Sequence, residues 1–154
     1  MNKINEPSEK KFHSLVSLYN SERFEDLRVC CISMLEEFPN SPKLHNILGV
    51  AYNGLKELQK AVHCYNHALK LNPSYAEAYN NLGNTLKIKG DLDNAIQSFN
   101  KAVSLKPNFP QAYNNLGISH HASGDYALAI RQFQKALDFQ NDYVDAFLNK
   151  GRAL

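Results

Sequence analysis

Asparagine is the residue type whose spacing most clearly suggests chemistry in this sequence. An amide side chain carries two N–H donors and an acceptor oxygen, so a row of amides can pair with the backbone of another polypeptide whatever its sequence. Amides in the same places can instead hydrogen-bond to neighbouring backbone groups of this chain and have a purely structural role. The sequence leaves both roles open. At one constant interval the amides form a first row, Asn46, Asn80 and Asn114, and a second row, Asn81, Asn115 and Asn149.

Two histidines and two aspartates have spacings that could hold a metal ion. His63 and His67 are four residues apart and would share one face of a helix, but no Glu or Cys is placed to complete a site. We therefore expect these histidines on a solvated outer face. Asp91 and Asp93 are similar to a metal-nucleotide motif of sugar transferases, but helix capping explains them more simply. The sequence predicts no metal site and no cofactor.

Composition and motifs exclude several classes of protein. The 154 residues are 44% hydrophobic, which is enough for a packed core. The net charge is only +2, so the chain has no excess of cations for a row of phosphates, and nucleic acid is not an expected partner. The sequence contains no Gly-rich phosphate loop, nucleophile elbow or paired acid/base set, so we expect no enzyme activity.

The cysteines and the first residues bear on the cellular location. Cys30, Cys31 and Cys64 are odd in number, and the first two are adjacent, which is unfavourable geometry for a disulfide between them. Free thiols indicate a reducing compartment, and Cys31 is expected to be a packing residue. No signal peptide and no stretch of about 18 apolar residues is found. We therefore expect a cytoplasmic protein without a membrane partner.

The interval that separates the asparagines of one row also predicts the repeated units that would position them. Glycines recur with a period of about 34 residues, and so do alanines, aromatic residues and prolines. Dividing the sequence by this period gives repeated units of residues 42–75, 76–109 and 110–143, followed by a partial unit of residues 144–154. The glycines that define the period are Gly49, Gly83, Gly117 and Gly151.

Each unit is predicted to contain two amphipathic helices. Apolar residues such as Ala78, Leu82 and Leu86 follow helical rather than strand spacing. Gly90-Asp91 and Gly124-Asp125 lie between the two helices, where glycine can end one helix and aspartate can cap the next. Small residues such as Gly83 and Ala95 would let the two helices approach closely.

The 76–109 unit contains eight characteristic positions: Tyr79, Leu82, Gly83, Leu86, Ala95, Phe99, Ala102 and Pro107. These positions resemble the signature of the tetratricopeptide repeat family. The resemblance implies an all-α fold, a right-handed α-solenoid of antiparallel helix pairs with about four repeats and one trailing helix. It also implies a flexible N-terminus over residues 1–7, a degenerate capping repeat over residues 8–41 and a single solenoid domain.

The same resemblance implies that the first helix of each pair lines a concave groove. The asparagine rows are then similar to the asparagine ladder of the repeat domain in O-linked N-acetylglucosamine transferases. The carboxylate clamp for chaperone tails looks absent, because Asn46, Gln111 and Asn115 occupy places where it needs cations. The groove residues expected to contact a peptide are Asn46, Asn80, Asn81, Asn84, Lys87, Gln111, Asn114, Asn115, His121 and Asn149.

Three functions are consistent with these residues. The first is a non-catalytic module that binds an extended or helical segment of a partner protein in an Asn-lined groove. The second is the substrate-recruiting N-terminal region of a larger glycosyl-, sulfo- or methyltransferase, which the partial unit 144–154 favours. The third is an assembly block that forms homo-oligomers end to end, because a trailing amphipathic helix would expose its outer face.

Overall fold

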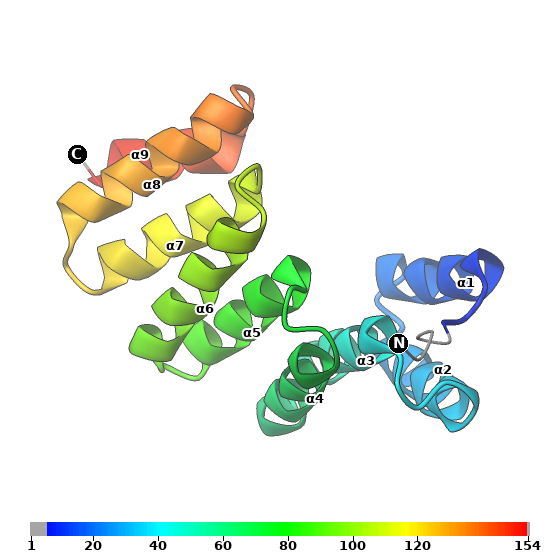
Figure 1. Cartoon of the computed structure of the whole chain (residues 1–154). Coiled ribbons are helices and arrows are strands. Elements are labelled where there is room, and N and C mark those ends of the chain that lie inside the picture. Colours follow the sequence, from blue (N-terminus) through cyan, green and yellow to red (C-terminus); the bar gives the residue numbers. More distant parts are fainter. Residues whose placement is uncertain (1–5, 154) are drawn as a thin grey trace. The chain divides into compact units, whose positions relative to one another are not determined.

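A computed structural model of the chain describes residues 6–153, and over this range it forms nine helices and no strand (Figure 1). Residues 1–5, expected in the flexible N-terminus, and Leu154, expected in the trailing helix, lie outside the described range. The helices are α1 Glu9–Asn20, α2 Phe24–Glu37, α3 Pro42–Gly54, α4 Leu58–Leu71, α5 Ala76–Ile88, α6 Leu92–Leu105, α7 Pro110–Ala122, α8 Tyr126–Phe139 and α9 Val144–Ala153.

Helix starts recur with the period of the sequence. First helices begin at Pro42, Ala76, Pro110 and Val144, so each begins one full period after the one before. Each first helix from α3 to α7 is followed by an antiparallel second helix after a short turn (Figure 1). The predicted all-α array of helix pairs is therefore confirmed.

The chain divides into two compact units, and the division falls within α5. The first unit extends to Asn81 and contains α1 to α4 with the start of α5; the second unit begins at Leu82 and contains the rest of α5 with α6 to α9. None of the helices in residues 6–153 combines the length and the apolarity that a membrane crossing requires.

Turn residues end the first helices of two pairs. Gly90 and Gly124 have φ values of +82° and +83°, a left-handed conformation that glycine adopts without the steric cost of a Cβ. The Asp91 side chain caps α6 by accepting a hydrogen bond of 3.4 Å from the backbone N–H of Asn94. Asp125 precedes α8 but makes no side-chain cap, so the prediction of a cap at that position was wrong.

The chain just before α1 is held against the start of α3. Pro7 is buried, and the Ser41 hydroxyl donates a hydrogen bond to the carboxylate of Glu6. Ser41 also caps α3, because its Oγ accepts a hydrogen bond of 3.1 Å from the backbone N–H of Leu44. Glu6 and Pro7, expected in a flexible segment, therefore have defined packing.

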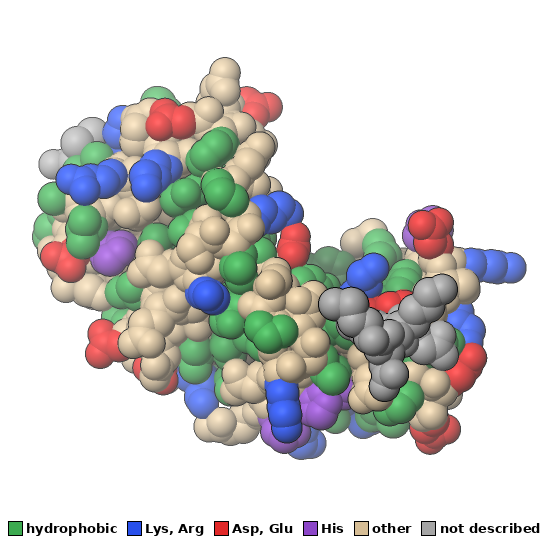
Figure 2. Space-filling model, viewed as in Figure 1, with side chains coloured by type: hydrophobic (Ala, Val, Ile, Leu, Met, Phe, Trp, Pro, Cys, Tyr) green, Lys and Arg blue, Asp and Glu red, His purple; other side chains and the backbone are tan. Residues whose placement is uncertain are grey.

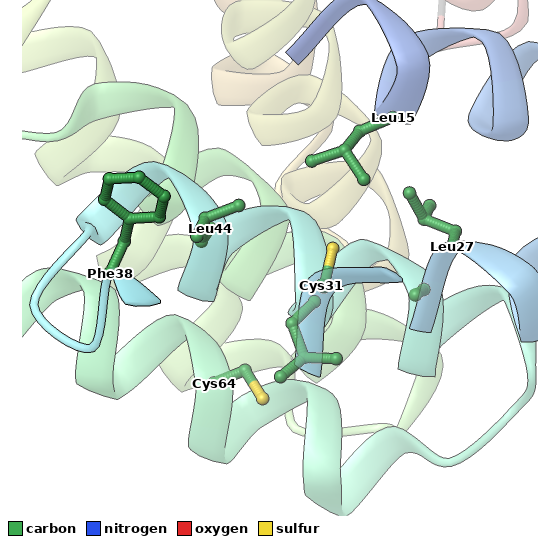
Figure 3. Packing of buried hydrophobic residues seen from close by; sticks show 8 residues of the cluster. Leu15, Leu27, Cys31, Phe38, Leu44 and Cys64 are labelled. Carbon is green, nitrogen blue, oxygen red and sulfur yellow. The ribbon is translucent and has the colours of Figure 1, made fainter. Parts of the chain in front are cut away.

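The core of the first unit consists mainly of aliphatic side chains with the Phe38 ring and two thiols (Figure 3). Leu15 of α1, Leu27 of α2 and Leu44 of α3 are buried together with Cys31 and Cys64. Burial raises the pKa of the Cys31 thiol to about 12 and that of Cys64 to about 11. Both thiols are thus protonated near neutral pH, and Cys31 is a packing residue as the sequence predicts.

Close glycine–aromatic contacts hold each of three helix pairs together. In each pair a glycine of the first helix faces a ring of the second helix, and a Cβ on that glycine would lie inside the contact distance of the ring. The closest approaches would be 2.6 Å for Gly49 to Tyr65, 2.7 Å for Gly83 to Phe99 and 2.5 Å for Gly117 to Phe133. These glycines therefore set how closely the paired helices approach.

Gly117→Ala is expected to lower the free energy of unfolding. The added methyl group would overlap the buried Phe133 ring, and overpacking of this kind costs about 1–3 kcal/mol against a gain of about 1 kcal/mol in helix propensity. Gly151→Ala is the matched control, because nothing lies within 4 Å of its added Cβ, and it should stabilise by up to about 1 kcal/mol. Urea denaturation of both variants measures the difference, and equal stabilisation of both would contradict the contact.

Candidate functional site

The residues predicted to bind a peptide all lie on the first helices of the pairs. Asn46 is on α3 and Asn149 is on α9. The other eight are on α5 and α7: Asn80, Asn81, Asn84, Lys87, Gln111, Asn114, Asn115 and His121. The structure thus places the predicted residues on one helix of each pair, and their contacts divide them into groups with different chemistry.

The first row of asparagines is buried, and the second row is half-buried. In the first unit, the Asn81 amide donates a hydrogen bond of 3.0 Å to Asn46 Oδ1. In the second unit, the Asn149 amide donates an equivalent bond of 3.1 Å to Asn114 Oδ1. Side chains of the two rows therefore bond one another between successive first helices.

Tyrosines complete the surroundings of the first row. The Asn46 amide approaches the Tyr75 hydroxyl at 3.5 Å, and Asn114 makes a side-chain hydrogen bond with Tyr143, which is in the equivalent place. Burial raises the pKa of Tyr75 to about 12, so its hydroxyl is neutral at physiological pH. Asn46 and Asn114 therefore have a structural role, since a buried amide without partners would be costly.

A cavity of about 240 Å³ lies beside the second-row amide of the first unit. Its apolar walls come from α1, α2 and α3, and Val16 and Tyr19 are each 50% exposed at its edge. The lining residues are Leu15, Val16, Tyr19, Leu27, Ile47, Val50 and Asn81. We call this the first-unit cavity; it combines one amide with an otherwise apolar surface.

A smaller cavity of about 160 Å³ lies beside the second-row amide of the second unit. It brings together two predicted residues, His121 and Asn149, with Ile118, Phe133 and Arg152. The His121 ring packs edge-on against Tyr126, with ring centroids 5.1 Å apart. We call this the second-unit cavity. Its lining contains an amide and an aliphatic side chain, as in the first-unit cavity, and also a guanidinium and an imidazole.

The two cavities use equivalent positions of the repeat. Val50 and Ile118 are separated by two periods, and so are Asn81 and Asn149. Sequence reasoning missed Val16, Tyr19 and Arg152, although Val16 precedes Val50 by one period and Arg152 follows Ile118 by one period. The period itself was the signal that could have found two of these three residues.

The remaining predicted residues lie outside the described cavities. Asn84 is half-buried and Gln111 is exposed. Lys87 is also half-buried, and desolvation lowers the pKa of its ammonium group. A partly desolvated cation gains more from an anionic ligand than one in bulk water, so Lys87 stays a candidate for contact with a ligand.

Histidines gather with lysines over α3 and α4 in the view of Figure 2. A cavity of about 410 Å³ there is lined by His45, His63 and His67 among other residues. The rings of His45 and His67 lie 4.1 Å apart, and a ring nitrogen of His45 lies 2.9 Å from the Pro39 carbonyl. The prediction of a simple solvated face was therefore wrong for His67, because it packs against a histidine of the preceding helix.

Within residues 6–153 no three His, Cys, Asp or Glu side chains are grouped so that they could hold a metal ion. Burial, and after it the nearby His45, His63 and Lys70 side chains, lower the pKa of His67. A neutral, packed imidazole is consistent with this environment.

Family models match most of the repeated region. A model described as TPR repeat matches residues 49–87 and 83–124, and a model described as tetratricopeptide repeat matches residues 110–143. The chain belongs to the tetratricopeptide repeat family. No curated protein matches the sequence significantly.

Several solved structures share this fold, and two of the three compared below are described as TPR proteins. MamA is 27% identical and has a TM-score of 0.77, covering 88% of this chain and 80% of that one. YrrB, described as a TPR protein with an unusual peptide-binding site, is 22% identical with a TM-score of 0.78, covering 92% and 73%. The first TPR of Spaghetti (RPAP3), bound to the HSP90 peptide SRMEEVD, is 17% identical with a TM-score of 0.72, covering 73% and 90%.

Removing one member of an asparagine pair is expected to destabilise this tetratricopeptide array. Asn149→Ala removes the donor to the buried Asn114 carbonyl, which should cost about 1 kcal/mol. A double-mutant cycle with Asn114→Ala, measured by urea denaturation, should give a coupling of about 0.5–1.5 kcal/mol. Strict additivity of the two substitutions would show that the pair contributes nothing.

The packed histidine predicts a pH dependence of stability. The folded-state pKa of His67 is lowered, so the unfolded chain binds more protons below the ordinary histidine pKa. Stability should therefore be complete above about pH 7 and should fall as the pH drops below about 6.5. Urea denaturation at both ends of this range should show a smaller loss for His67→Gln than for His13→Gln, whose side chain is exposed on α1.

Proposed function

We propose that this chain is a non-catalytic interaction module that binds an extended segment of a partner protein through its first helices. The predicted residues keep their proposed role in ligand contact, either directly or by orienting a neighbour. They are Asn46, Asn80, Asn81, Asn84, Lys87, Gln111, Asn114, Asn115, His121 and Asn149.

The observation that carries the proposal is the repeated combination of a second-row amide and a cavity. Asn81 lies in the first-unit cavity and Asn149 in the second-unit cavity, and each is oriented by a hydrogen bond to a buried asparagine. An extended peptide presents backbone N–H and C=O groups alternating with side chains. An amide that pairs with the backbone and an adjacent cavity that takes a side chain suit such a ligand.

The size and walls of the first-unit cavity favour one bulky apolar side chain. About 240 Å³ is below the range of about 300–1,000 Å³ that is typical of small-molecule sites. Leu15, Ile47 and Val50 offer no charge to a polar group. A leucine, isoleucine or phenylalanine side chain of a peptide would bury apolar surface here, which stabilises binding.

The second-unit cavity favours a different ligand group. Arg152 can donate paired hydrogen bonds to a carboxylate, and His121 adds a further donor when it is protonated. Ile118 and Phe133 supply the apolar wall. We therefore infer that an acidic side chain, or an acidic residue next to an apolar one, is preferred in the second unit.

Two structural neighbours and the cysteines support the proposal. YrrB has a peptide-binding site by its description, and the RPAP3 domain holds a peptide with acidic residues. The three cysteines are free thiols, and we infer a reducing compartment such as the cytoplasm from them. A protein or peptide partner within that compartment fits both observations.

Substitution at the edge of the first-unit cavity tests the proposal. Peptides selected from an array should bind Val16→Asp at least tenfold more weakly than the unchanged protein, because a carboxylate in the cavity opposes apolar burial. Val29→Asp is the matched control, since Val29 is 53% exposed on α2 and does not line the cavity. Fluorescence polarisation with labelled peptides gives both affinities.

Three results would overturn the groove assignment. One is that no array peptide binds the unchanged protein. Another is that Val16→Asp and Val29→Asp bind the selected peptides equally well at unchanged thermal stability. A third is that Arg152→Glu weakens binding of acidic peptides no more than Arg131→Glu, which alters an exposed side chain on α8.

A further inference from the structure

Of the three cavities described above, the largest is not used by the proposed peptide sites. It lies on α3 and α4 and has a volume of about 410 Å³, which is within the range of about 300–1,000 Å³ that is typical of small-molecule sites. We call it the histidine cavity, and its lining includes His45, Leu48, Tyr52, His63, Cys64 and His67.

Part of the lining of the histidine cavity is apolar. The Leu48 and Cys64 side chains are buried, and Tyr52 is half-buried. Burial raises the pKa of the Cys64 thiol to about 11, so the thiol carries no negative charge at physiological pH. An aromatic ring against these residues would bury apolar surface, which stabilises binding.

A second part of the lining consists of imidazoles. His63 and His67 are one turn apart on α4, and the His67 ring lies 4.1 Å from the His45 ring of α3. Pro39 holds His45 in place, because a ring nitrogen of His45 lies 2.9 Å from that backbone carbonyl, which can only accept a hydrogen bond. No aspartate or glutamate is among the described residues that line the cavity. This part of the cavity therefore suits an anionic group.

The same positions of the repeat carry a permanent cation in the second unit. Lys135 follows His67 by two periods, and Tyr113 follows His45 by two periods. The Lys135 Nζ lies 5.4 Å from the centre of the Tyr113 ring. A cation over an aromatic ring in one unit is thus replaced in the other by two neighbouring imidazoles, whose charge depends on the pH and on what they bind.

We propose that the histidine cavity binds a small aromatic molecule that carries one carboxylate. Its ring lies against Leu48 and Tyr52, and its carboxylate accepts hydrogen bonds from the imidazoles of His63 and His67. An inorganic anion would leave the apolar part of the cavity uncovered. A neutral aromatic molecule would gain nothing from the charge of a protonated imidazole.

The neighbouring charges favour a ligand with one negative charge. Lys60 lines the cavity, but it forms an ion pair with Glu57. Arg28 of α2 is near Lys60 and donates a hydrogen bond of 3.1 Å to Glu25. Both of these cations are thus paired, which leaves Lys70 and protonated histidine to balance the charge of a ligand.

Binding of a carboxylate should be linked to proton uptake by His67. Desolvation, followed by the nearby His45, His63 and Lys70, lowers the pKa of His67. A carboxylate close to the ring favours the protonated form and acts in the opposite direction. The affinity should therefore rise as the pH falls toward about 6, because the complex holds more protons than the free protein.

Isothermal titration calorimetry on the full chain, with naphthoate as the probe, tests the proposal. Naphthoate keeps one negative charge between about pH 6 and about pH 8, and its affinity should be at least about threefold higher at the lower pH. Naphthylmethanol has the same rings without the carboxylate. It should bind more weakly than naphthoate, and its affinity should be the same at both pH values.

NMR signals of the histidine rings locate the bound probe. The signals of His45 and His67 should shift and saturate with naphthoate, while that of His13, which is exposed on α1, should not move. His67→Gln should remove most of the pH dependence of the affinity, and His13→Gln is the matched control that should keep it. Circular dichroism checks that both variants keep their helical content.

The proposal is overturned by any of four results. The His45 and His67 signals show no saturable shift, naphthoate and naphthylmethanol bind equally well at the lower pH, or His67→Gln keeps the full pH dependence. A shift of the His121 signal alone would place the probe in the second-unit cavity and is the fourth. The peptide proposal does not depend on these results, because its test alters Val16 in the first-unit cavity.

Discussion

The contact between a helical glycine and an aromatic ring of the next helix is the constraint on which the rest of each unit depends. At Gly49 and Gly117 the ring of the second helix fills the space that any side chain would occupy. Because this contact sets the distance and the facing sides of a helix pair, it also sets the direction of every other side chain on the first helix. Asn46 and Asn114 lie three residues before these glycines, nearly one helical turn away, and are buried.

The second-row asparagines point to a different side of the first helix than the first-row asparagines, because the glycine contact sets the direction of both. A residue two positions from another on a helix is turned by more than half a revolution, so Asn81 faces away from the contact at Gly83 and Asn149 faces away from Gly151. They are half-buried, line cavities and donate to the buried amides. One residue type therefore lies in two environments in this chain, since Asn46 and Asn114 are buried between helices and Asn81 and Asn149 line cavities.

The two cavities show how a repeat can keep its geometry and change its chemistry. Val50 and Ile118 are both aliphatic, and each is near a second-row amide. Val16, one period before Val50, extends the first-unit cavity, whereas Arg152, one period after Ile118, extends the second-unit cavity. An apolar cavity and a cationic one thus lie beside equivalent aliphatic and amide positions of the repeat.

Local pattern alone determined the helices, their pairing and the buried glycines, because a single period in the Gly, Ala and aromatic positions specifies the same helix pair in each unit. It also placed Cys31 in the core. Tertiary packing alone decided which amides are buried, where cavities open and that His67 meets His45. These features depend on how side chains from different helices fit together and on the space left between them. The spacing of residues along one helix does not specify that fit.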